Sequence, residues 1–292
     1  MYNLRYHVAS LVAVFLALTV GLLLGTVVAE RGTVGEQSAA LVADLQQQFK
    51  GLQGENTNLT AELGRTSAFN SDVVPALLAG RLSDTTVAVV VNAGRGGGLA
   101  SLLAALEQAG ATPVVYTLEA SALRLTESVP EGLPELIGGE FAQGPAGPAS
   151  AAFVDAVAVR LAEEWTSAGS RPVTDLLART GALSIRGDAG GAAADACVAM
   201  SAFGGAPDDF ALRIAEAFDA AGRRALGAEA STQETGVAAD AADRGLSAVD
   251  HVDTPQGAVS LVWLLSGAAE GSFGFGPAAE SAYPDLTVGR AE

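Results

Sequence analysis

The sequence predicts an α/β protein in three parts: a single N-terminal transmembrane helix, a coiled-coil helix, and a doubly wound, mostly parallel, Rossmann-like domain. An uncharged apolar run near the amino terminus, a heptad pattern after it, and apolar strands alternating with amphipathic helices support this prediction. We expect residues 1–7 to be cytosolic, 8–29 to cross the membrane, 36–79 to form a stalk, 80–272 an extracytoplasmic domain, and 273–292 a flexible C-terminal tail.

The apolar run from Val8 to Ala29 contains no charged residue. As a helix it spans about 30 Å, the thickness of a bilayer's hydrocarbon core. It exceeds the apolar region of a secretory signal, about 7–15 residues, although the small residues at 27–29 leave a cleaved signal as the alternative. Arg5 precedes the run, so the positive-inside rule predicts a single-pass protein of the cytoplasmic membrane with its C-terminal domain outside.

A heptad pattern follows the apolar run and predicts a parallel dimeric coiled coil. Its a and d positions are Val42, Leu45, Phe49, Leu52, Asn56, Leu59 and Leu63. A polar residue at an a position, here Asn56, fixes register and favours two strands. Gly21 and Gly25 form a small-xxx-small pair that lets membrane helices approach closely. We therefore expect a homodimer, the alternative being an amphipathic helix packed on its own domain.

The rest of the chain alternates between strand and helix patterns. We expect strands at residues 85–94, 112–120, 194–203, 223–231 and 245–253, and helices at 97–111, 153–169, 173–183, 206–222, 234–245 and 254–268. The strands are apolar without alternation, which is typical of a parallel sheet covered on both faces.

Composition limits the classes of function. The formal net charge is −17, the isoelectric point is near 4.4, and no segment gathers Lys or Arg, so a nucleic-acid partner is not expected. The glycine-rich loop NAGRGGGL departs from GxGxxG at Leu99 and lacks GK[ST], and neither GxSxG nor HExxH occurs. We expect no enzymatic activity and no cofactor.

Three residues are candidate metal ligands: Cys197, Met200 and His251. Soft sulfur ligands suit Cu(I). However, Cys197 and Met200 are three residues apart on a predicted strand, where they point to opposite faces. A structural role in the core is therefore the favoured interpretation.

The segment VDHVDTPQG contains a possible binding crevice formed by Asp250, Asp253 and Thr254 beside His251. These residues lie at the carboxyl end of a predicted strand, where open α/β sheets bind ligands. The favoured alternative is structural: Pro255 starts a helix, and Asp253 or Thr254 is its N-cap.

Several segments resemble the actinobacterial copper transporter MctB family: RYHVASLVAVFLALTVGLLLGTVV, the heptads, PALLAGRLSDTTVAVVV, SAVDHVDTPQGAVSLVWLL and GSFGFGPAAES. The resemblance implies a role in copper homeostasis or efflux at the cell envelope, with copper as transported or sensed ion. It also implies an alternative, a cell-division scaffold acting with a membrane partner protein and a coiled-coil peptidoglycan hydrolase. The single apolar helix favours a dimeric scaffold over a pore.

Overall fold

The structure is a computed structural model that describes residues 4–30, 33–92, 97–119, 129–141, 150–187, 191–200, 209–231 and 236–287. The chain divides into two compact units between Ala68 and Phe69. Its elements are α1 (Leu4–Glu30), α2 (Thr33–Leu78), β1 (Thr86–Asn92), α3 (Gly97–Gln108), β2 (Thr112–Leu118), α5 (Leu133–Ile137), the 3-10 helix η1 (Gly139–Phe141), α6 (Ala151–Thr166), α7 (Pro172–Arg179), β3 (Leu183–Arg186), β4 (Ala196–Met200), α8 (Phe210–Ala220), β5 (Arg224–Ala228), α9 (Val237–Asp243), β6 (Ser247–Val249), α10 (Pro255–Ser266) and β7 (Ser272–Phe273).

The first unit is helical. Within α1, the 22 residues Tyr6–Val27 are long and apolar enough to cross a bilayer. Helix α2 contains the heptads, and the apolar side chains at their a and d positions from Val42 to Leu63 are 44–71% exposed. The large apolar side chains of both helices, from Tyr6 to Val27 in α1 and from Val42 to Leu63 in α2, are therefore not covered by other residues of the first unit.

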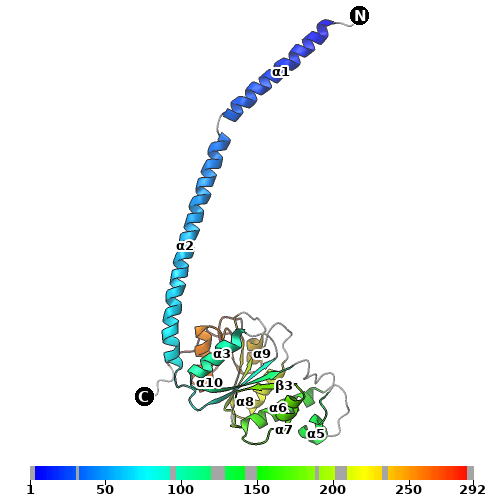
Figure 1. Cartoon of the computed structure of the whole chain (residues 1–292), viewed down its shortest axis with the longest axis vertical. Helices are drawn as coiled ribbons and strands as arrows, with labels where there is room; N and C mark the ends of the chain where they lie inside the picture. Colours follow the sequence, from blue (N-terminus) through cyan, green and yellow to red (C-terminus); the bar gives the residue numbers. More distant parts are fainter. Residues whose placement is uncertain are drawn as a thin grey trace. The chain divides into compact units, whose positions relative to one another are not determined.

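The second unit is the α/β domain, which confirms the predicted fold class (Figure 1). Its seven strands run in the order β3-β2-β1-β4-β5-β6-β7, and all neighbouring pairs are parallel except β2 with β3. From β1 the chain adds β2 and then β3 on one side of β1. It then crosses to the other side of β1, where β4 pairs with it. This reversal between β1 and β4 is the topological switch point of a doubly wound sheet.

Two of the seven strands lie outside the five predicted ones. Strand β3 follows α7 directly, and it pairs antiparallel with β2 at the edge of the sheet. Its residues after Leu183 are exposed, so it lacks the apolar run that marks the central strands. Strand β7 has only two residues, too few for any periodicity to reveal it.

Helices cover both faces of the sheet. One face packs against α5, α6, α7, α8 and α9, with Trp165, Phe153 and Phe218 among its largest buried side chains. The other packs against α3, α10 and the end of α2, with Trp263 and Leu102 in its core. The end of α2 belongs to this second core because Leu78 is fully buried.

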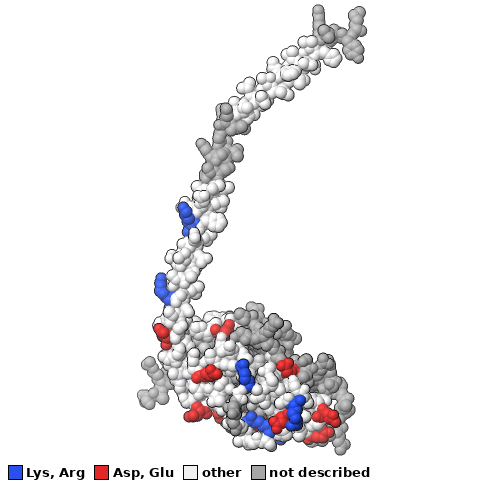
Figure 2. Space-filling model, viewed as in Figure 1, with Lys and Arg blue, Asp and Glu red and all other residues white. Residues whose placement is uncertain are grey.

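Residues 273–287, where we expected a flexible tail, carry specific contacts. Phe273 is buried, and the amide of Gly274 donates to the carbonyl of Ser281 at 2.9 Å. Leu286 packs against the core that contains Trp263. On the face drawn in Figure 2, acidic side chains are spread over the α/β domain with basic ones set among them.

Candidate functional site

The carboxylate of Asp250 is the centre of the segment that the sequence singled out. Asp250 follows β6 directly and is 4% exposed. Its Oδ1 accepts a hydrogen bond from the amide of Phe275 and its Oδ2 accepts one from the amide of Gly276, both at 2.6 Å. Buried carboxylates require such donors, because an unpaired charge in the interior is costly. Asp250 therefore ties the end of β6 to the turn after β7, and we call Asp250 with its two amide donors the Asp250 latch.

The glycines of that turn leave room for this carboxylate. An added Cβ on Gly274 would overlap the Asp250 carboxylate, and one on Gly276 would lie 2.6 Å from Oδ2. Gly274 also has a φ of 143°, a conformation that side-chain-bearing residues rarely adopt. The GFG sequence and Asp250 thus form one packing unit, although they are far apart in the chain.

His251 is held by the same carboxylate. Its Nδ1 lies 2.7 Å from Asp250 Oδ1, and because a carboxylate accepts hydrogen bonds, this contact favours the tautomer with the proton on Nδ1. The His251 side chain is 32% exposed, and its ring meets the Phe275 ring edge-to-face at 5.2 Å. This pairing of a buried carboxylate with imidazole is the arrangement that orients a histidine for proton transfer or metal binding.

The backbone of His251 is also held in place by hydrogen bonds. Its φ of 54° is unusual for a residue other than glycine. This conformation directs its carbonyl to the amide and hydroxyl of Thr254, which donate at 2.9 and 2.8 Å. Thr254 in turn accepts from the amide of Gly257 at 3.1 Å and is the N-cap of α10. Of the two N-caps the sequence allowed, the structure has Thr254.

Asp253 has a different partner. Its carboxylate accepts hydrogen bonds from the amide of Ser231 at 2.6 Å and from its hydroxyl at 2.7 Å. Partial burial raises the pKa of Asp253, but the Ser231 hydrogen bonds, together with the backbone of Asp253 and the nearby His251, outweigh this effect, and the pKa lies below its usual value. The structure thus brings Asp250, His251, Asp253 and Thr254 to one edge of the sheet, where each has a structural partner.

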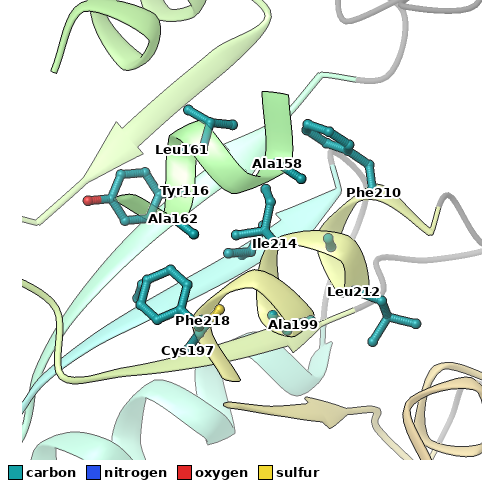
Figure 3. Close-up of a cluster of buried hydrophobic side chains, with 14 of the residues drawn as sticks. Tyr116, Ala158, Leu161, Ala162, Cys197, Ala199, Phe210, Leu212, Ile214 and Phe218 are labelled. Carbon is teal, nitrogen blue, oxygen red and sulfur yellow. The ribbon is translucent and has the colours of Figure 1, made fainter. Parts of the chain in front are cut away.

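Cys197 and Met200 both lie on β4, which β5 separates from β6, and they lie on opposite faces of the sheet. Both are fully buried on β4, but Cys197 packs in the core that contains Phe218, on one face of the sheet (Figure 3), whereas Met200 packs with Leu102 on the other. Burial strongly raises the pKa of the Cys197 thiol, which keeps it neutral and a poor ligand. Among the described residues, no group of three His, Cys, Asp or Glu side chains could hold a metal ion.

The predicted dimer residues lie on exposed helical surfaces. Nothing lies within 4 Å of a Cβ placed on Gly21 or Gly25 of α1. The seam of α2, which we define as Val42, Leu45, Phe49, Leu52, Asn56, Leu59 and Leu63, is exposed along its length.

The model of one protein family matches residues 1–284, nearly the whole chain, from the apolar helix to the Asp250 latch and its GFG turn. The chain belongs to the MctB family. That family is described as a copper transport outer membrane protein. No curated protein and no solved structure matches the chain.

This MctB-family domain also has a cavity that the sequence did not indicate. Its volume is about 570 Å³, and it lies at the amino-terminal end of β5 and β6, the opposite edge from Asp250. The charged side chains that line it are Asp219, Arg224, Glu270 and Glu280. The Arg224 guanidinium lies against Gly267, which caps the C-terminus of α10, a favourable place for a positive charge.

The glycine-rich loop after β1 lies partly outside the described residues, at 93–96. Its end is described: Gly98, in the first turn of α3, has no room for a side chain. An added Cβ would lie 2.5 Å from the Cβ of Ala230 and 2.9 Å from the Met200 Cε. In this MctB-family chain, the glycine therefore serves close packing of α3 on the ends of β4 and β5.

Proposed function

We propose that this chain acts in copper homeostasis at the cell envelope as a membrane-anchored, dimeric scaffold. The family description supplies the copper role. The scaffold is supported by the exposed seam of α2, whose six apolar side chains remain 44–71% exposed. Exposed apolar residues at a and d positions bury their surface by pairing with another helix.

The membrane arrangement follows from α1. Its apolar segment Tyr6–Val27 anchors the chain, and Arg5 keeps the amino terminus in the cytosol. A single helix satisfies its backbone hydrogen bonds internally and encloses no path for an ion. A role in supporting or sensing copper transport therefore fits α1 better than conduction by one chain.

Crosslinking of the full chain in membranes tests the scaffold. With Cys197 replaced by Ala, cysteines at Leu45 and Leu52, both d positions, should form disulfide dimers. The matched controls are cysteines at Gln47 and Gly54, which lie on the opposite face of the helix. Equal crosslinking at all four positions would refute the seam.

Copper titration of the full chain in detergent tests the metal role. His251 is the one metal candidate with a partly exposed side chain, whereas Cys197 is buried as a neutral thiol. We therefore expect His251→Ala to reduce any copper binding and Cys197→Ser to leave its affinity unchanged. Loss of tight Cu(I) binding in Cys197→Ser alone would show that the buried thiol is the ligand.

A second candidate function rests on the same seam. A helix that exposes a and d residues could also receive a coiled coil of a peptidoglycan hydrolase, with a membrane partner protein beside α1. Pull-down with the purified hydrolase coiled coil, using Phe49→Ser and Leu59→Ser to disrupt the seam, distinguishes this function. Cell-division defects without altered copper tolerance in those variants would favour it.

A further inference from the structure

The seam of α2 changes its environment before the helix ends. From Val42 to Leu63 its apolar a and d side chains are 44–71% exposed. In the next turns Asn70 at a and Val73 at d are half-buried. Leu77, again at an a position, packs against the domain core that contains Trp263, and the adjacent Leu78 is fully buried.

The flanking positions show which side of the helix is covered. Val74, at an e position, packs against the same core as Leu77. Phe69, at a g position, is 64% exposed. The chain's own domain therefore covers the a and e positions in the last turns of α2. These are positions that a partner helix in a parallel coiled coil would contact.

The end of α2 and the turn that follows it are firmly attached to this core. Leu82 is 1% exposed, and the Arg81 guanidinium lies 3.4 Å above the ring of Trp263 in α10. Turning Leu77 toward a partner helix would draw it and the adjacent Leu78 out of this core and break this stacking. A partner helix would bury less apolar surface in this stretch than the domain would expose.

We infer that the coiled coil between two copies of this chain ends near Thr66, and that at Asn70 the seam passes from the second copy to the chain's own domain. This inference rests on the proposed dimer. It places Asn56 inside the helix pair and Asn70 outside it, although both occupy a positions. The pair would extend from Val42 for about 36 Å, at 1.5 Å per residue.

A second copy is the partner that the seam fits. In a parallel pair in register, Asn56 faces Asn56 of the other copy, and the two amides satisfy each other. Glu55 and Glu62, at g positions, then face the neutral Thr60 and Ser67 at e positions. An antiparallel self-pair would instead set these acidic g positions against one another. The sequence thus suits a parallel pair of identical helices.

The two asparagines provide a matched test in the full-length protein. Asn56→Leu should tighten the dimer about ten-fold, because it replaces a buried polar pair by an apolar one. Asn70→Leu should leave the dimer dissociation constant unchanged, because the helix pair has ended. Sedimentation in detergent measures both constants. Equal tightening by the two variants would overturn the inference.

Cysteine crosslinking tests the end point of the coiled coil and the existence of the dimer separately. In the Cys197→Ala background, Leu59→Cys should crosslink in membranes and Val73→Cys should not, although both are d positions. Equal crosslinking would overturn the inference and leave the dimer standing. No crosslinking at Leu59 or Leu52 would overturn both. A thermal melt of the Val73→Cys protein that matches its parent shows that the domain is intact.

Discussion

The α/β domain and the helical unit differ in the exposure of their large apolar side chains. In the domain, large residues such as Trp165 and Trp263 are fully buried between sheet and helices. In α1 and α2, large apolar side chains are exposed from Tyr6 to Val27 and from Leu41 to Phe69. The domain completes its core with its own residues, whereas in the proposed arrangement lipid covers the apolar surface of α1 and a second helix covers that of α2.

Glycines show the same difference. In the domain, Gly98, Gly227 and Gly274 lie where an added Cβ would meet other atoms. In the helices, Gly21, Gly25, Gly51 and Gly54 have no atom within 4 Å of that position. Packing therefore requires glycine at these three positions of the domain. Those of α2 weaken a helix unless a partner uses the space.

The largest expected effect is the loss of the Asp250 latch. Asp250→Ala removes the acceptor of two amides and one imidazole, so we expect the domain to lose about 3–5 kcal/mol of unfolding free energy. Urea denaturation measures the loss. The control Asp219→Ala changes an exposed carboxylate at the cavity and should cost under about 0.5 kcal/mol. Equal effects of the two substitutions would show that the latch is not stabilising.

Overpacking at Gly98 comes next. Gly98→Ala places a methyl group 2.5 Å from the Cβ of Ala230, so α3 must shift. We expect a loss of about 1–3 kcal/mol in domain stability, again by urea denaturation. Ala100→Gly, at an exposed position in the same helix, controls for helix propensity alone. An unchanged or raised stability would mean that α3 is less closely packed than the contacts indicate.

The same substitution should have the opposite sign in α2. Gly51→Ala and Gly54→Ala should each stabilise the helix by about 1 kcal/mol per chain, because nothing crowds these sites. Circular dichroism of the fragment 36–66 should show mostly unfolded wild type and a visibly helical double variant. A fragment whose helicity does not rise would indicate that glycine at these two positions does not destabilise α2.

The fold was predictable where periodicity was strong. The apolar helix, the heptads and the central strands β1, β2, β4 and β5 each carry a long pattern. Strand β3 was missed because its side chains after Leu183 are exposed at the sheet edge. The contact of Asp250 with Phe275 and Gly276 joins residues about two dozen positions apart, and no local pattern reveals it. The cavity was missed because the residues that line it come from α8, β5, α9, β6 and α10, which are far apart in the sequence.

The smallest effect concerns a surface ion network of the domain. Asp209 lies before α8 and accepts hydrogen bonds from Arg213 at 3.0 and 2.7 Å and from Arg244 at 3.2 Å. The hydrogen bonds from Arg213, followed by the positive charge of Arg213 and the hydrogen bond from Arg244, lower the pKa of Asp209 below its usual value. A lowered pKa in the folded state stabilises the protein above the unfolded-state pKa, about 3.9, and the gain disappears as the pH falls through the folded pKa.

Asp209→Asn should therefore destabilise the domain at pH 7 and make little difference near pH 2. The side chain is 38% exposed, so solvent screening limits the pH 7 loss to under about 1 kcal/mol. Urea denaturation of both proteins from pH 7 downward gives the difference at each pH, and Asp219→Asn is the control. The difference should close only below the unfolded-state pKa. A gap that is constant with pH would show that the hydrogen-bond geometry of Asp209, and not its charge, stabilises this surface.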